Sequence, residues 1–163
     1  VEPLIPYSQN IPIADYLFDK KFNGKFQTST IFTSKSTFIK EKFDELIPKH
    51  QDWDWAINCY HRGFHFEQIF EPLTNYTVSS NGVGSVQNQG IEYDYEWLKR
   101  ITPKINSNAF NSYLTRYIFS ALAAEKNSKE NKVKILLKIF KDNKIKLYSK
   151  VALIGILKIF LKS

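Results

Sequence analysis

The sequence predicts an α/β fold over about the first 90 residues, followed by an all-helical extension. Three observations support this prediction. Residues 25–33 are rich in β-branched and aromatic side chains, a composition typical of a strand. Residues 64–70 largely alternate apolar and polar side chains, which also indicates a strand. Beyond residue 91 the apolar residues recur at helical spacing and continue to do so.

The first 48 residues contain mostly short elements. Prolines and Gly24 make residues 1–24 a connecting segment, with one short helix expected over residues 13–18. In the strand predicted over residues 25–33, the polar residues Gln27, Thr28 and Ser29 either line a site or form the solvated face of a half-buried strand. A helical turn over residues 36–43 follows.

The next segment, residues 49–63, predicts a helix with Asp52 in its first turn and Gly63 as its stop. The unpaired N–H groups and the helix dipole at a first turn favour the ionised form of a carboxyl group. A carboxyl group must be ionised to act as a general base. Asp52 is therefore either a catalytic base or an ordinary capping residue. Asp54 lies about 200° further round the helical wheel, and we expect it at the surface.

A polar, glycine-containing stretch follows the second predicted strand. That strand ends at residues 71–73, a further extended piece is expected over residues 75–78, and residues 79–90 form a loop. Loops of this length without structure of their own are commonly lids or binding loops.

Helices are predicted throughout the last 70 residues. Pro103 is expected to open the longest one, and Ser149 to cap the last, over residues 150–162. The uncharged run over residues 151–157 is far shorter than the roughly 20 residues of a membrane span. It fits either a packed helix or one that lies in a membrane interface.

Charge and cysteine content narrow the function classes. Residues 126–163 hold eleven lysines against Glu130 and Asp142, a net charge of +9 in a chain whose total is +7, so the first 125 residues carry −2. A basic tail on a slightly acidic domain argues against a nucleic-acid-binding domain. A single cysteine, Cys59, excludes an internal disulfide, fits a cytoplasmic location and is expected to be a small core residue. The absence of methionine, even at position 1, indicates a fragment.

Searches for metal and phosphate motifs yield little. Gly82-Val83-Gly84 lacks the context of a dinucleotide site, and no P-loop is present. His61 and His65 are four residues apart, but Gly63 separates them, and no second cysteine is available. We therefore expect no metal site within this chain.

An ordered set of short motifs resembles the C-terminal, acceptor-side half of the bacterial family 2 glycosyltransferases, which have a GT-A fold. The resemblance covers the chain from about residue 13 and includes a helical extension after Trp97-Leu98. Its motifs are Gln27-Thr28-Ser29-Thr30, Phe43-Asp44, His50-Gln51-Asp52-Trp53-Asp54-Trp55, Gly63, Glu71-Pro72-Leu73 and Tyr76.

The resemblance implies a catalytic role for Asp52, which matches the base that takes the proton of the acceptor hydroxyl. Gln51 stands where the family usually has a glutamate. Residues expected to shape the acceptor pocket are Gln27, Thr28, Ser29, His50 and Trp53, and those of a donor loop are Ser80, Asn81, Gly82 and Ser85. The family's nucleotide-binding strands and Asp-x-Asp metal motif have no match here, since Asp52-Trp53-Asp54 has the letters of the motif but lies at the position of the base. The resemblance therefore implies that the Mg²⁺ or Mn²⁺ of the full-length enzyme binds mostly outside this chain.

The sequence thus predicts part of an inverting glycosyltransferase of envelope polysaccharide synthesis, inactive alone. Residues 1–90 would be the acceptor-side half and residues 91–163 the helical extension. Expected partners are a nucleotide-sugar donor, a glycan or lipid-linked acceptor and an anionic membrane surface at residues 126–163, but not nucleic acid. The alternative is a non-enzymatic basic module that binds membranes or other partners.

Overall fold

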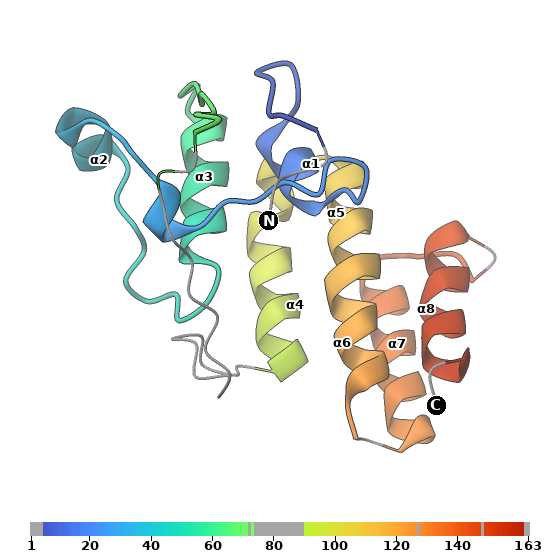
Figure 1. Cartoon of the computed structure of the whole chain (residues 1–163). Coiled ribbons are helices and arrows are strands. Elements are labelled where there is room, and N and C mark those ends of the chain that lie inside the picture. Colours follow the sequence, from blue (N-terminus) through green and yellow to red (C-terminus); the bar gives the residue numbers. More distant parts are fainter. Residues whose placement is uncertain (1–4, 72, 74–89, 127, 148, 162–163) are drawn as a thin grey trace.

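A computed structural model describes residues 5–71, 73, 90–126, 128–147 and 149–161. Within these residues every regular element is a helix, and no strand is present (Figure 1). The predicted α/β fold is therefore wrong for the part of the chain that the structure describes.

Short helices make up the first part of the chain. They are α1 (Ile13–Phe18), the 3₁₀ turn η1 (Thr28–Thr30), α2 (Lys35–Lys40) and α3 (Gln51–His61). The start and end of α3 agree with the sequence prediction, since Asp52 lies in its first turn and Gly63 follows it with φ +82°. Glycine adopts this left-handed conformation without the steric penalty that other residues meet.

Longer helices follow residue 90, as predicted. They are α4 (Gly90–Ile101), the 3₁₀ turn η2 (Thr102–Lys104), α5 (Ser107–Tyr113), the π-helix η3 (Leu114–Ile118), α6 (Phe119–Ala124), α7 (Lys129–Asp142) and α8 (Lys150–Leu161). The three elements α5, η3 and α6 form one continuous rod (Figure 1). Ser149 caps α8 as expected, because its Oγ accepts the N–H of Ala152 at 3.2 Å. Pro103 lies in η2 and does not open the rod, which begins after Asn106.

The first predicted strand, residues 25–33, is replaced by the η1 turn. The hydroxyl of Thr30 donates to the carbonyl of Gln27 at 2.7 Å, and the Thr30 N–H bonds to the same carbonyl at 2.8 Å. Threonine side chains that bond to nearby backbone compete with strand pairing. Because strand propensity depends on having a neighbour to pair with, this segment turns instead.

The second predicted strand, residues 64–70, keeps the alternation of faces but lacks a pairing partner. Phe64, Phe66 and Gln68 are half-buried, whereas the residues between them are exposed. Gln68 accepts the N–H of Tyr7 at 2.8 Å. The predicted strand is therefore wrong, because strand pairing needs a neighbour that the described residues do not supply.

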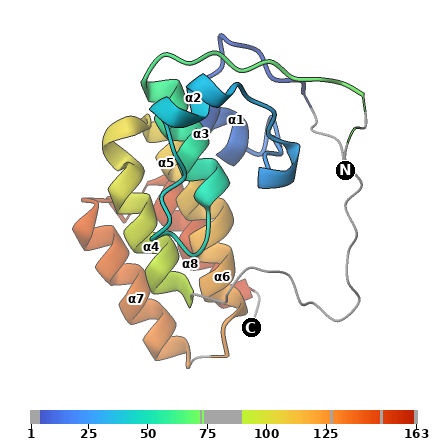
Figure 2. The same ribbon diagram turned by 90° about the vertical axis from the view of Figure 1, so that its left-hand side faces the viewer.

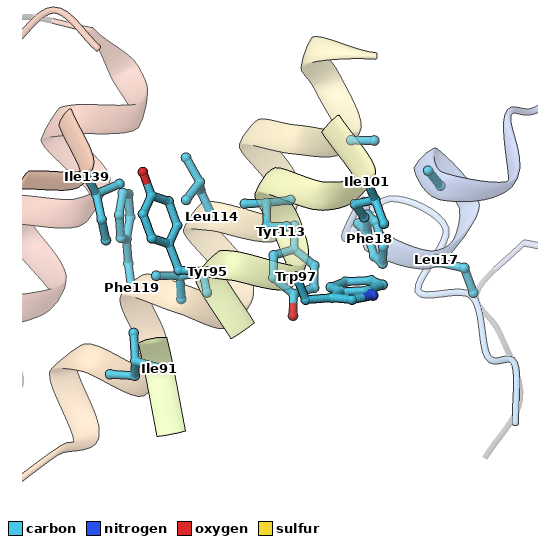
Figure 3. Close-up of a cluster of buried hydrophobic side chains, with 14 of the residues drawn as sticks. Leu17, Phe18, Ile91, Tyr95, Trp97, Ile101, Tyr113, Leu114, Phe119 and Ile139 are labelled. Carbon is cyan, nitrogen blue, oxygen red and sulfur yellow. The ribbon is translucent and has the colours of Figure 1, made fainter. Parts of the chain in front are cut away.

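One buried cluster joins the helices on both sides of residue 90. Phe18 of α1, Trp97 of α4 and Tyr113 of α5 meet in its middle, and Phe119 and Ile139 continue it toward α7 (Figure 3). Ring centroids of Phe18 and Tyr113 are 5.0 Å apart in an edge-on contact. Burial of these rings fixes α1, α3 and α4 against the α5–α6 rod.

The π-helix explains a lysine in the otherwise apolar α8. A π turn leaves a backbone carbonyl without its usual helical partner. The Lys158 ammonium donates to the carbonyl of Thr115 and to Ser120 Oγ, both at 2.5 Å. Lys158 thereby links α8 to the rod.

Candidate functional site

The site is built on the first turn of α3. The chain enters this helix through His50, whose φ of +69° is rare for a residue with a side chain. Asp52 Oδ1 accepts the backbone N–H of Trp53 at 2.9 Å. The Trp53 indole donates to the carbonyl of Phe26 at 3.2 Å, which holds the η1 segment against the start of α3.

Asp52 is half-buried, and this burial raises the pKa of its carboxyl group. Hydrogen bonds from the backbone N–H groups of Trp53 and Thr28, together with nearby His50, lower the pKa but do not outweigh the burial. The first-turn N–H groups lower the pKa of Asp52, as the sequence predicts. Burial by tertiary packing raises it by more, so the net shift is upward. A carboxylate with a raised pKa is a better proton acceptor than an exposed one.

A groove of about 450 Å³ adjoins the start of α3, where Gln51, the residue before Asp52, lines it. Thr28, whose backbone N–H helps to lower the pKa of the Asp52 carboxyl group, forms part of the groove wall. The remaining lining residues are Phe43, Asp44, Glu45 and Ile47. Two carboxylates on an aromatic and aliphatic wall can accept hydrogen bonds from the hydroxyls of a neutral sugar, and they repel a diphosphate.

The structure brings some of the predicted site residues together. Thr28 lies near enough to Asp52 for its backbone N–H to lower the pKa of that carboxyl group, and Gln27 and Ser29 lie exposed in the same short turn. The predicted donor-loop residues, Ser80, Asn81, Gly82 and Ser85, lie outside the described residues.

The two aromatic members of the predicted acceptor pocket point inward. The His50 ring stacks on Trp53 with centroids 4.8 Å apart and lies 4.5 Å from Trp97. Its side chain is only 8% exposed. Trp53 also packs edge-on against Phe18 and Tyr117. Both rings thus hold α3 in place, and direct contact with an acceptor stays a prediction.

A buried polar network continues from His50 to α4 and α5. His50 Nε2 lies 3.0 Å from Asp94 Oδ1 and 3.0 Å from the Tyr113 hydroxyl, and Lys49 Nζ lies 2.7 Å from the same carboxylate oxygen. Burial disfavours the charged form of Asp94, but the hydrogen bonds from His50 and Lys49 outweigh it and lower its pKa. Asp94 was not predicted as part of the site; the available signal in the sequence was a carboxylate on the otherwise apolar face of α4.

Asp54 is buried, so its predicted surface position is wrong. Its side chain points away from Asp52 as the helical wheel requires, but α4 covers that side of α3. It accepts hydrogen bonds from Trp97 Nε1 at 3.1 Å, Asn58 Nδ2 at 3.0 Å and Arg100 Nη2 at 2.7 Å. Arg100 also binds Asp44 of the groove at 2.9 Å, so one guanidinium ties the groove wall to α3.

Cys59 belongs to the core, as predicted. Its side chain is buried, and burial together with the negative charge of Glu41 raises its pKa to about 12. The thiol is therefore protonated at neutral pH and unsuited to nucleophilic attack. Among the described residues, no group of three or more His, Cys, Asp or Glu side chains is placed to hold a metal ion.

Comparison with known proteins identifies one relevant relative. The amylovoran biosynthesis glycosyltransferase AmsB of Erwinia amylovora is 32% identical to this chain over 113 residues. The match covers 69% of the chain and 37% of that protein, so the chain spans well under half of this relative's length. No family model matches the chain. No solved structure matches it. The similarity supports a relationship to a glycosyltransferase.

Proposed function

We propose that this chain forms the acceptor-binding and proton-accepting part of an inverting, family 2 glycosyltransferase. The enzyme would move a sugar from a nucleotide-sugar donor to a glycan or lipid-linked acceptor in cell-envelope polysaccharide synthesis. The observation that carries the proposal is the position of Asp52, half-buried with a raised pKa beside an acidic groove. The similarity of this chain to a glycosyltransferase of amylovoran biosynthesis also supports the proposal.

In the proposed reaction Asp52 acts as the general base. An acceptor hydroxyl in the groove loses its proton to the Asp52 carboxylate while its oxygen bonds to the anomeric carbon of the donor sugar. The bond from that carbon to the phosphate oxygen breaks, and the electron pair leaves with the nucleoside diphosphate. Attack from the face opposite the leaving group inverts the anomeric configuration.

The charge of the groove favours an acceptor over a donor. Asp44 and Glu45 line the groove together with Thr28 and Gln51. These carboxylates would repel the diphosphate of a nucleotide sugar but can hold a hydroxyl-rich glycan. The groove therefore fits the acceptor half of the reaction.

The donor half of the reaction requires residues beyond those described. The described acidic residues and histidines do not form a cation site. A Mg²⁺ or Mn²⁺ ion, which would neutralise the leaving diphosphate, is proposed to bind mostly outside this chain. We also propose the loop with Ser80, Asn81, Gly82 and Ser85 as a cover for the donor.

The test is a transfer assay of the full-length natural protein with a panel of nucleotide sugars and Mg²⁺ or Mn²⁺. Asp52→Asn is expected to lower the transfer rate about a hundredfold or more, because the general base is lost while the amide keeps the size of the side chain. The matched control is Glu96→Gln, an exposed carboxylate on α4 that should leave the rate unchanged.

Loss of folding would not explain this result. Because burial raises the pKa of Asp52, the folded state binds its proton more tightly than the unfolded state, and ionisation at neutral pH lowers stability. Asn carries no charge, so the variant should be at least as stable as the wild type at pH 7. Equal transfer rates in both proteins would assign Asp52 to helix capping, whereas no transfer by the wild type with any nucleotide sugar would favour the non-enzymatic module.

A further inference from the structure

The helix α8 carries an apolar face that points away from the rest of the molecule. Leu153, Leu157 and Leu161 recur at a spacing of four residues and are 55%, 43% and 76% exposed. Ala152, Gly155 and Ile159 form the opposite, buried face. The sequence alone predicts a nearly uniform apolar helix, and the structure divides it into a packed side and a bare side.

Close packing fixes which side is bare. A Cβ atom at Gly155 would lie 2.9 Å from Leu136 Cδ1 of α7 and 3.0 Å from Phe119 Cε2 of α6. The absence of a side chain there lets α8 seat deeply on both helices. Lys158 bonds α8 to the rod on one flank. Together these contacts prevent α8 from rolling to hide its leucines.

Positive charge lies on α7, the helix that packs beside α8. The exposed side of α7 carries Lys134, Lys138 and Lys141 around the half-exposed Leu137. Lys144 in the following turn and Lys150 at the start of α8 are exposed as well. This surface lies at the end of the molecule opposite to α2 and α3, and in Figure 2 α8 is the most distant helix.

We propose that the exposed leucines of α8 and the lysines of α7 form a docking surface for the interface of an anionic lipid bilayer. The leucines would enter the boundary between head groups and acyl chains, and the lysines would contact anionic head groups. No described helix is long and apolar enough to cross a membrane. Twelve residues of α helix extend about 18 Å, so α8 lies along the surface.

The lysines and the exposed leucines together favour an anionic bilayer over a nucleic acid or a second copy of this chain. A nucleic acid would use the lysines but gain nothing from three exposed leucines. A second copy of this chain would bring an equal set of lysines to the same contact, and like charges would oppose it. An anionic bilayer satisfies both the apolar and the basic part of the surface.

The experiment is co-sedimentation of the full-length protein with phosphatidylcholine vesicles, with and without phosphatidylglycerol. We expect binding that requires phosphatidylglycerol and weakens as salt is raised. The double variant Leu153→Gln/Leu157→Gln should lower the affinity about tenfold or more. A triple variant, Lys134→Gln/Lys138→Gln/Lys141→Gln, should remove most of the preference for the anionic lipid.

The matched control is Phe32→Gln/Leu46→Gln, which removes two side chains that are 94% and 90% exposed outside this surface. It should leave vesicle affinity unchanged. The proposal fails if the wild-type protein ignores anionic vesicles or if both double variants weaken binding equally. It also fails if light scattering shows a dimer that only the α8 variant dissociates, or if DNA binds without need of the leucines.

This inference does not depend on the proposed catalytic role of Asp52. The Asp52→Asn variant should bind vesicles like the wild type, and the α8 variant should still transfer sugar to a water-soluble acceptor. Each proposal can therefore fail while the other stands.

Discussion

The contact between α3 and α4 and the contact of α8 with α6 and α7 are held by different interactions. The first uses buried carboxylates, Asp54 with Arg100 and Asp94 with Lys49 and His50. In the second, the half-buried Lys158 of α8 donates to the carbonyl of Thr115 and to Ser120 Oγ in the rod. The remaining contacts there are apolar and depend on the small volume of Gly155.

This difference indicates what each region requires. A buried carboxylate accepts hydrogen bonds only in certain directions, so the α3–α4 contact admits one register and holds Asp52 in one place. Apolar packing is less directional and tolerates changes that conserve volume. Hydrogen-bond direction therefore constrains the contact that carries the proposed base, whereas close packing constrains α8.

The largest effect is expected from breaking the polar contact. Asp54→Ala leaves the buried Trp97 indole N–H without its acceptor and removes one carboxylate from Arg100. We expect the free energy of unfolding to fall by about 3 kcal/mol in urea denaturation at neutral pH. Asp44→Ala, which removes the exposed partner of the same guanidinium, should cost much less, because water screens an exposed ion pair. Equal losses would show that burial does not distinguish the two pairs.

A smaller effect is expected from crowding the apolar contact. Gly155→Val places two methyl groups against Leu136 and Phe119, and the free energy of unfolding should fall by about 2 kcal/mol. Leu153→Val puts the same branched side chain on the exposed face of α8 and should change stability by no more than about 0.5 kcal/mol. Thermal unfolding of both variants measures the difference. If Gly155→Val left the stability unchanged, α8 would have to shift on its neighbours to make room for the side chain.

The smallest effect concerns pH. The folded-state pKa of Asp94 lies below its unfolded value, so its stabilisation is complete above about pH 4 and is lost as the pH falls through the folded value. Asp94→Asn should lower the free energy of unfolding at pH 7 by about 1–2 kcal/mol. Below pH 4 the wild type should lose this advantage, and the two unfolding curves should converge. If the difference in the free energy of unfolding between the two proteins stayed constant down to pH 2, this would contradict a role for the ionised carboxylate.

Sequence by itself determined the features that depend on neighbours a few residues apart. The first-turn place of Asp52, the stop at Gly63, the Ser149 cap and the helices beyond residue 90 follow from local hydrogen bonds and a 3.6-residue period. The core position of Cys59 follows from the same periodicity.

Only the tertiary structure decided the rest, because it depends on residues far apart along the chain. Residues 25–33 and 64–70 have strand propensity but do not form strands, because no partner strand lies beside them in the described part of the chain. Asp54 proved buried because Arg100 and Trp97, more than 40 residues away, cover it. The pKa of Asp52 is raised because packing removes water from a helix end that would otherwise favour the charge. Periodicity specifies which side of a helix is apolar, whereas long-range packing decides what covers each side.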